Sequence, residues 1–423
     1  MQGQGLYTFN GSYTKHGHSE KAPCFFKSRL QALAPFMKNT PFLWDIFCQV
    51  VDNHGDLGVC WRLSRHLVAL GHHVRLYVDD ASALTWMAPH HQDHASLRVL
   101  PWPSDDSLAS WEACGWQRPH CVIEAFGCEL PNVYLHNVLA PEPQGEKSRA
   151  WVWTWINLEH LSAEDYPNRM HKLASPVLQG VASGMTKWFF YPGFTTQTGG
   201  LLKKHVPSFL LSNEAVHETS AQALTWPAQA NLRVFVFSYE PRALKDLLLQ
   251  LSHSERSVHL KISAGRSSVF TRSLLKSPEL LGQQATTQSP QVHIKKMSIE
   301  FLEHVDHAGF DALLQSSDLN FVRGEDSWVR AIWAEKPFVW QIYPQDDGVH
   351  FKKINAFLNR FEAPDSLKQA FMVWNEFEHA QFPRLSEELL GAWAQWSRQV
   401  AKELNGRTDL AIQLSEFLSL KQA

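Results

Sequence analysis

The sequence lacks an excess of charge of either sign. Its 423 residues include 39 lysines and arginines and 42 aspartates and glutamates, which gives a formal net charge of -3. A protein whose main partner is a nucleic acid usually presents a basic surface, because it has to neutralise phosphate groups. The composition therefore predicts that nucleic acid is not the main partner.

Cysteine is scarce, and the motifs of several enzyme classes are missing. The six cysteines form no C-x-x-C pair, which argues against a zinc knuckle and against a redox motif. The strings H-E-x-x-H and G-x-S-x-G and the P-loop string are also absent. We therefore expect no metal site and no cofactor, and we expect reduced thiols in a cytoplasmic protein.

Long apolar runs are missing as well. No stretch of about 18 uncharged apolar residues occurs, so we expect no membrane span. Residues 1–40 contain no apolar segment typical of a secretion signal, and we expect them to form a flexible N-terminal extension. The remaining length favours two domains of roughly 150–200 residues each.

The sequence does contain an alternation of strand and helix patterns that starts near Leu43. "LWDIFCQVV" is typical of a buried strand, "GVCWRLSRHLVALG" has helical spacing that ends at Gly71, and "HHVRLYVDD" is typical of a second strand. This βαβ pattern predicts a parallel, doubly wound sheet. Strand-like segments continue to about residue 194, and we predict a Rossmann-like first domain at 41–222.

The alternation starts again at "RVFVFSYE", continues through "QVHIKKMS" and runs to "PFVWQIY", with "RGEDS" as a turn. We predict a second Rossmann-like domain at 229–385. A helical tail at 386–423 follows, with a return to the first domain as one option. Two doubly wound domains that face a central cleft indicate an α/β protein of GT-B architecture, although two lobes of periplasmic-binding type would give a similar pattern.

The loop in "VVDNHGDLGV" carries two acidic residues where α/β proteins often bind phosphate. Its two glycines do not make a G-x-G-x-x-G cradle. Asp52 and Asp56 would repel a phosphate by a few kcal/mol at an effective dielectric constant of about 20. Carboxylates here can instead hold a guanidinium or ammonium group and accept a proton. The structural alternative is that Asp56 caps a helix beginning near Leu57 and that Asp52 forms an Asx turn.

A second loop, "FVRGEDSWVRA", has the opposite polarity. Arg323 supplies a permanent cation, Gly324 permits close backbone approach, and Ser327 stands where a helix would begin with free N–H groups. These features predict a seat for a diphosphate. Glu325 and Asp326 would turn aside to bind sugar hydroxyls or to cap the helix. The structural alternative is a surface arginine paired with an acidic cap.

Aromatic residues follow two strands of the second domain. Phe237 and Tyr239 alternate along "FVFSYE" and point to one side of the strand. Such a pair can hold a nucleobase, although aromatic residues in this position more often belong to the core. Tyr343 and Gln345 follow another strand and are expected near the same cleft.

Four strings together resemble the bacterial protein-arginine rhamnosyltransferases that modify elongation factor P. They are "DNHGDLGVCWRLSRHL", "WINLEHLSAEDY", "FFYPGFTTQTGGLL" and "DLNFVRGEDSWVRAIWAEKPFVWQIYPQDDG". The resemblance covers most of residues 43–350. It implies a metal-independent, inverting GT-B enzyme of the cytoplasm. The donor would be TDP-β-L-rhamnose, and the product would be an α-linked rhamnosyl arginine on elongation factor P.

The resemblance also implies roles for particular residues. Asp52 and Asp56 match the acidic pair of the family, with Asp56 as the base toward the acceptor arginine. Phe237 and Tyr239 fall where the family holds thymine. The residues that match the donor loop are Arg323, Glu325, Asp326 and Ser327. The chain departs from the family pattern at His304 and His307, where an aromatic residue and a glutamine are expected.

An arginine acceptor would explain the acidic loop. The guanidinium group has a pKa above about 12 and is a poor nucleophile until carboxylates hold its charge and disturb its delocalisation. We predict that Asp52 and Asp56 grip the guanidinium and that Asp56 accepts its proton. Glu325 would orient the guanidinium or the sugar. Arg323 and the helix N-terminus would stabilise the departing diphosphate.

Two other functions fit the same fold. One is a GT-B transferase with another acceptor, such as a lipid-linked or small sugar. The other is a non-catalytic protein that keeps the nucleotide site and binds a sugar nucleotide.

Overall fold

The computed structural model describes residues 41–51, 55–92, 94–104, 117–139, 153–204, 224–280, 289–343 and 348–422. The N-terminal extension lies outside these ranges. Asp52 and Gln345, two of the predicted site residues, also lie outside them, and their roles stay predictions.

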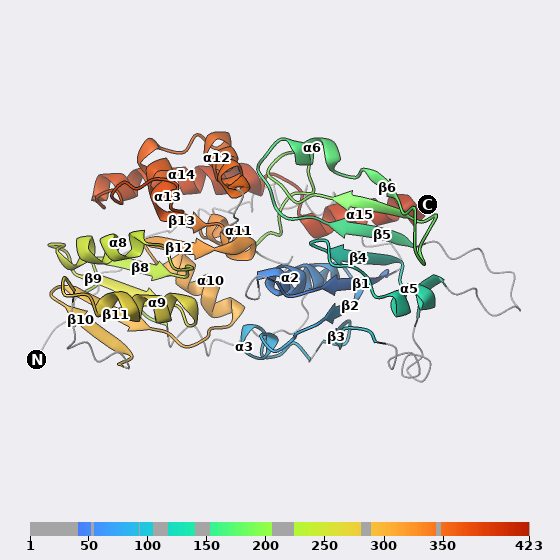
Figure 1. The fold of residues 1–423 in the computed structure, drawn as a ribbon, viewed down its shortest axis with the longest axis horizontal. Coiled ribbons are helices and arrows are strands. Elements are labelled where there is room, and N and C mark those ends of the chain that lie inside the picture. Colours follow the sequence, from blue (N-terminus) through green and yellow to red (C-terminus); the bar gives the residue numbers. More distant parts are fainter. Residues whose placement is uncertain are drawn as a thin grey trace, which may run out of the picture. The chain divides into compact units, whose positions relative to one another are not determined.

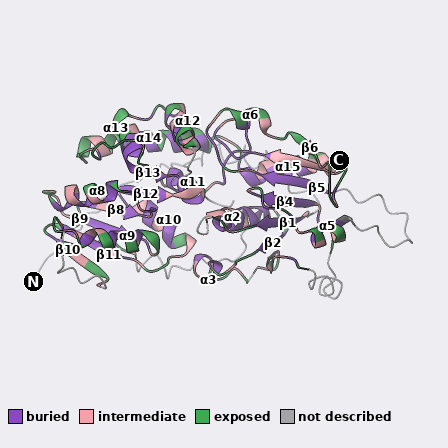
Figure 2. Cartoon of the chain, viewed as in Figure 1, coloured by how far each residue is buried: buried purple, intermediate pink, exposed green. Residues whose placement is uncertain are grey.

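The first lobe contains a largely parallel sheet. Its strands are β1 (Leu43–Cys48), β2 (His73–Val78), β3 (Leu97–Pro101), β4 (Cys121–Ala125), β5 (Thr154–Leu158), β6 (Ala174–Pro176) and β7 (Thr186–Phe190). Within the described residues the strand order is β3-β2-β1-β4-β5-β7-β6, with only β6 antiparallel to its neighbour. The strands predicted from apolar runs are confirmed, and Figure 2 shows most of them buried.

Helices cover both faces of this sheet. They are α2 (Gly55–Ala69), α3 (Leu84–Met87), α5 (Asn132–Leu139) and α6 (Tyr166–Met170). The apolar face of α2 packs on one side of the sheet, through residues such as Leu57 and Leu67, and α5 packs on the other. The chain leaves α2 through Gly71, whose φ of 88° favours glycine. This confirms the predicted βαβ unit.

The second lobe also contains a largely parallel sheet with helices packed against it. Its strands are β8 (Leu232–Val236), β9 (Val258–Ile262), β10 (Gln291–Ile294), β11 (Met297–Phe301), β12 (Leu319–Arg323) and β13 (Phe338–Gln341). The order across the described sheet is β10-β11-β9-β8-β12-β13. The segment "QVHIKKMS" forms β10 and the start of β11, an antiparallel hairpin in which the chain turns at Lys295 with a φ of 52°.

The helices of the second lobe are α8 (Ala243–Ser252), α9 (Arg266–Leu275), α10 (His307–Ser316), α11 (Gly324–Ala334), α12 (Val349–Arg360), α13 (Asp365–Trp374) and α14 (Glu387–Asn405). The predicted turn "RGEDS" is wrong, because α11 already begins at Gly324. In the part of the chain that the structure describes, no helix is both long enough and apolar enough to cross a membrane.

The C-terminal tail divides between the lobes. Trp393, Trp396 and Leu404 of α14 belong to the core of the second lobe. The last helix, α15 (Leu410–Gln422), instead buries Leu414 and Phe417 in the core of the first lobe. Figure 1 shows α15 in red beside the green strands of that lobe. The tail therefore returns to the first lobe.

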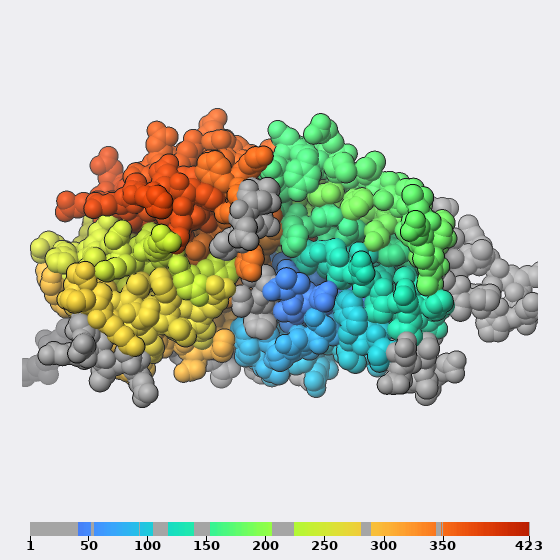
Figure 3. Space-filling view, in the orientation of Figure 1, coloured from blue at the N-terminus to red at the C-terminus, as the bar shows by residue number. Residues whose placement is uncertain are grey.

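Both sheets change strand direction at an equivalent point. In the first lobe β1 lies between β2 and β4, and in the second lobe β8 lies between β9 and β12, so the connections diverge between β1 and β4 and between β8 and β12. Ligands of doubly wound proteins bind outside the carboxyl ends of the strands at this switch point. Two such lobes joined in one chain are the predicted GT-B architecture, and Figure 3 shows the blue residues of the first lobe beside the orange ones of the second.

Candidate functional site

Among the cavities that the described residues form, two adjoin each other where the lobes meet. The large cavity, of about 410 Å³, is lined by the loops after β1, β4 and β5 and by the start of α11, the end of β13 and Lys353 of α12. The small cavity, of about 210 Å³, is lined mainly by the loops after β8, β9, β11 and β12 and by parts of α2 and α3. Gly55 and Gly324 line both cavities, so the two spaces adjoin there.

Asp56 lines the large cavity from the first turn of α2. The helix begins at Gly55, two residues before its predicted start, so the interpretation of Asp56 as the helix cap is wrong. Its Oδ2 accepts a hydrogen bond from the Val51 N–H at 3.3 Å. The carboxylate therefore lies in the first turn of α2 and binds the backbone of Val51, which follows β1. Tyr343, predicted to bind the donor, lines this same cavity.

Glu325 reaches the large cavity from the second lobe. Its Oε1 accepts from Lys353 Nζ at 2.9 Å and its Oε2 accepts from the Leu161 N–H of the first lobe at 2.8 Å. His160 Nδ1 lies 3.4 Å from Oε1. Partial burial opposes the charge, but Lys353, His160 and the Leu161 N–H outweigh it and lower the pKa of Glu325 to about 2. This residue is therefore a fixed anion and a weak base.

In the small cavity, Arg323 lies over two aromatic rings. Its Cζ is 4.8 Å from the ring centroid of Phe237 and 4.5 Å from that of Tyr239. The Tyr239 N–H donates to Gln341 Oε1 at 2.8 Å, which fixes the loop. Phe237 and Tyr239, predicted to hold a base, thus also orient the guanidinium of Arg323 by cation–π contacts.

The N-terminus of α11 meets the cavities at Gly324. That residue has a φ of 68°, which favours glycine, and its carbonyl accepts from Trp340 Nε1 at 2.8 Å. The N–H groups of the first helical residues, which include Gly324, Glu325 and Asp326, have no acceptor within the helix. Ser327 lies further in, with its hydroxyl donating to the Arg323 carbonyl. Ser327 lines the small cavity together with Gly324 and Asp326, and the binding of an anion at this helix start stays a prediction.

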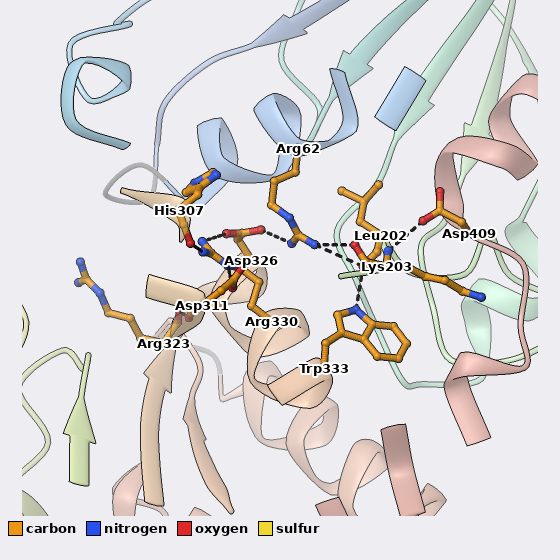
Figure 4. Close-up of polar contacts among 11 residues, drawn as sticks. Arg62, Leu202, Lys203, His307, Asp311, Arg323, Asp326, Arg330, Trp333 and Asp409 are labelled. Carbon is orange, nitrogen blue, oxygen red and sulfur yellow. Dashed lines mark hydrogen bonds and ion pairs between the residues drawn. The ribbon is translucent and has the colours of Figure 1, made fainter. Parts of the chain in front are cut away.

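Asp326 joins the two lobes, as Figure 4 shows. Its Oδ1 accepts from Arg62 Nη1 of α2 at 2.7 Å, and its Oδ2 accepts from Arg330 Nη1 at 3.2 Å. Burial raises the cost of its charge, but Arg62 and Arg330 lower the pKa of Asp326 to about 2. Asp326 lines the small cavity, and two arginines already hold its carboxylate. Its contact with the donor stays a prediction.

Gly58 allows this contact between α2 and α11. A Cβ atom at Gly58 would lie 3.3 Å from Asp326 Oδ2, and the arginines leave the carboxylate little freedom to move. We expect Gly58→Val to lower the free energy of unfolding by about 1–3 kcal/mol, because it overpacks the helix contact. The matched variant Gly391→Val lies on the exposed side of α14 with no atom within 4 Å, and its change should stay within about 0.5 kcal/mol. Equal effects in urea denaturation would contradict this packing.

Several residues of the small cavity were not predicted. Arg266 at the start of α9 pairs with Glu240 and lies 5.0 Å from the Tyr239 ring centroid. Trp86 of the first lobe contacts His304, with 4.4 Å between the ring centroids. Gly265, which lies between β9 and α9 in "SAGRSS", is the feature of the sequence that could have indicated Arg266. No local pattern identifies Trp86, because its role depends on how the lobes pack.

The two histidines that depart from the family pattern both line the small cavity. His304 contacts Trp86 across the seam between the lobes. His307 begins α10, and its carbonyl accepts from Arg330 Nη2 at 2.6 Å. Burial and the nearby Arg330 hold the pKa of His307 well below its usual value, so the ring is neutral. In the described ranges, no group of three or more His, Cys, Asp or Glu residues could hold a metal ion.

The sequence matches a known family over nearly all of its described part. The sequence model for the Elongation-Factor P (EF-P) rhamnosyltransferase EarP matches residues 44–419. A protein-arginine rhamnosyltransferase of Pseudomonas putida is 35% identical over 395 residues, covering 88% of this chain and 98% of that protein. A protein-arginine rhamnosyltransferase of Neisseria meningitidis serogroup B is 30% identical, covering 91% of this chain and 99% of that protein.

Solved structures agree with this match. A structure from work on EarP-mediated arginine glycosylation of translation elongation factor EF-P has a TM-score of 0.54 and 27% identity, covering 89% of this chain and 98% of the other. The glycotransferase of kitacinnamycin, at a TM-score of 0.50 and 13% identity, covers 90% of this chain and 100% of its own, and it shares the fold alone. The predicted fold and family are confirmed, and the chain belongs to the family of elongation factor P rhamnosyltransferases.

Proposed function

We propose that the protein transfers L-rhamnose from TDP-β-L-rhamnose to an arginine side chain of elongation factor P, with inversion at the anomeric carbon. The observation that carries this proposal is the polarity of the two adjoining cavities. The large cavity presents Asp56 and Glu325, whereas the small cavity presents Arg323 beside the N-terminus of α11. A cationic nucleophile and an anionic leaving group would meet where Gly55 and Gly324 lie.

The donor would occupy the small cavity. Arg323 and the N–H groups of Gly324, Glu325 and Asp326 are suited to a diphosphate, because they combine a permanent cation with the positive end of a helix dipole. The aromatic wall of Phe237 and Tyr239 would contact the nucleoside. The sugar would then extend past Gly324 toward the large cavity.

The acceptor arginine would occupy the large cavity. Asp56 holds the guanidinium, and one guanidinium nitrogen attacks the anomeric carbon on the face opposite the diphosphate. The nitrogen–carbon bond forms as the bond from that carbon to the phosphate oxygen breaks, and TDP leaves with the electron pair. Asp56 accepts the proton that the nitrogen loses. Attack from the opposite face converts the β-linked donor into an α-linked product.

The same arrangement supports a reaction that needs neither a metal nor a cofactor. Arg323 and the start of α11 supply positive charge at the leaving group, a task that other transferases give to a metal ion. An acceptor that works in translation also implies a cytoplasmic enzyme.

The direct test is a transfer assay with purified components. We expect TDP-rhamnose and elongation factor P, incubated with the protein and EDTA, to give an acceptor heavier by one deoxyhexosyl unit in intact mass spectrometry. Fragmentation should locate the sugar on arginine, and NMR should show the α configuration. Binding of TDP-rhamnose without transfer would favour the non-catalytic alternative. Transfer to another acceptor but not to elongation factor P would favour the other transferase.

Trp86 belongs to the first lobe and lines the small cavity, so a variant of this residue tests whether the donor binds there. Its contact with His304 puts both rings at the same wall of the small cavity. We expect Trp86→Ala to weaken TDP binding about tenfold, because contact between a base and an aromatic ring contributes roughly 1–3 kcal/mol. Trp86→Phe should keep most of the affinity. Calorimetry that finds unchanged TDP affinity for Trp86→Ala would exclude this contact.

A further inference from the structure

His160 lies in the large cavity beside the carboxylates that face it. Its ring stacks on Phe126, with 4.8 Å between centroids and 19° between planes. Its Nδ1 lies 3.4 Å from Glu325 Oε1, and its side chain is 51% exposed. The ring is therefore held in place on one side and accessible to a bound acceptor on the other.

Phe126, on which the His160 ring stacks, is held in place by its backbone. Phe126 has a φ of 58°, which is uncommon for a residue other than glycine, and its N–H donates to the Leu158 carbonyl at 2.7 Å. Conformations of this kind are concentrated at functional sites, where the surrounding structure maintains them. The stacking of His160 on Phe126 thus joins the loops after β4 and β5 at the cavity wall.

Charged groups approach His160 from three helices and from its own segment. Glu325 comes from α11, Lys353 from α12 and Asp56 from α2, while Glu159 precedes His160 in the chain. Desolvation disfavours the charged ring, but Glu325, with a smaller contribution from Asp56, raises the pKa of His160 above its ordinary value. These neighbours therefore favour the charged ring, and histidine is the side chain whose charge ordinarily changes between about pH 5 and pH 8.

The charge balance of the cavity depends on this proton. Among the described residues that line the large cavity, Asp56, Glu325 and Lys353 carry the other side-chain charges, and together they leave one net negative charge. A protonated His160 cancels that charge and binds the same Glu325 oxygen more strongly. A guanidinium group keeps its own charge throughout this pH range.

We propose that His160 is an acceptor-positioning residue: its neutral ring leaves the carboxylates to the acceptor arginine, and its protonated ring competes with that arginine. This inference rests on the proposed function, because the competing cation is the arginine of an acceptor protein. Linkage requires the effect to be reciprocal, so a bound acceptor must make His160 harder to protonate.

The first experiment measures acceptor affinity against pH without donor. We expect the wild-type affinity for unmodified elongation factor P to rise about tenfold between about pH 5 and pH 8. His160→Gln should keep high affinity across this range and lose the dependence. The control His136→Gln, on the exposed side of α5 away from both cavities, should behave as wild type. The same dependence in His160→Gln, or none in the wild type, would overturn the inference.

A second experiment uses the wild-type protein, so it does not depend on the folding of a variant. The NMR signal of His160 is assigned by its absence in His160→Gln and titrated with and without elongation factor P. We expect the acceptor to lower the pKa of His160; an unchanged or raised pKa in the complex would reject the inference while leaving the proposed transfer intact. Failure of elongation factor P to bind at any pH would reject the proposed function, and this inference with it.

Discussion

Asp56→Asn should lower kcat by about 10²–10⁴-fold while TDP binds almost as tightly as to the wild type. The amide of asparagine has nearly the same shape as the carboxylate, but it cannot accept the proton that the arginine nitrogen loses. Asp56 lines the large cavity and not the small one, so the donor site should stay intact. The measurements are single-turnover transfer to elongation factor P and calorimetry with TDP.

Asp79 provides a control that distinguishes the role of Asp56 as a base from its hydrogen bond to the loop backbone. Asp79 Oδ1 accepts from the Val50 N–H at 2.9 Å, just as Asp56 accepts from the Val51 N–H. Asp79 does not line the large cavity. We expect Asp79→Asn to cost less than about tenfold in kcat. Similar losses in both variants would mean that the loop, and not the base, limits transfer.

Arg323→Ala should have the second largest effect. We expect kcat to fall by about 10²–10³-fold, because the variant removes a charged hydrogen-bond donor from the leaving group, and TDP to bind more weakly. Arg323→Lys should recover part of the loss, since lysine keeps the charge but lacks the planar fork. The measurements are kcat with saturating TDP-rhamnose and the dissociation constant of TDP.

Arg233 offers the matched control for Arg323. It lies on β8 and forms an ion pair with Asp318 at 2.7 Å, at the opposite end of the strands from the cavities. Arg233→Ala should leave TDP affinity unchanged. Loss of TDP affinity in Arg233→Ala equal to that in Arg323→Ala would indicate damage to the second lobe instead of a missing contact with the donor.

The sequence was sufficient to predict several of the loops that line the two cavities. Apolar runs predicted β1, β8 and β12, and residues that follow such strands gather at the switch points of doubly wound sheets. This is why Asp56 was expected at one cavity mouth and Arg323 at the other. Helix starts were harder to predict. The chain turns into α11 at Gly324 because its φ is positive and Trp340 holds its carbonyl.

Contacts between distant segments could not be predicted. Arg62 and Asp326 are 264 positions apart and meet where Gly58 leaves room between α2 and α11. His160 and Lys353 reach Glu325 from different lobes. No periodicity or local motif encodes such pairs, since they depend on how two separately folded surfaces pack.

The most direct test of the proposed division of charge is a crystal structure of the protein with TDP and unmodified elongation factor P. We expect the acceptor guanidinium to lie in the large cavity within hydrogen-bonding distance of Asp56. The diphosphate should lie on Arg323 and the first N–H groups of α11. An arginine bound outside the large cavity, or a diphosphate bound away from α11, would contradict the proposal.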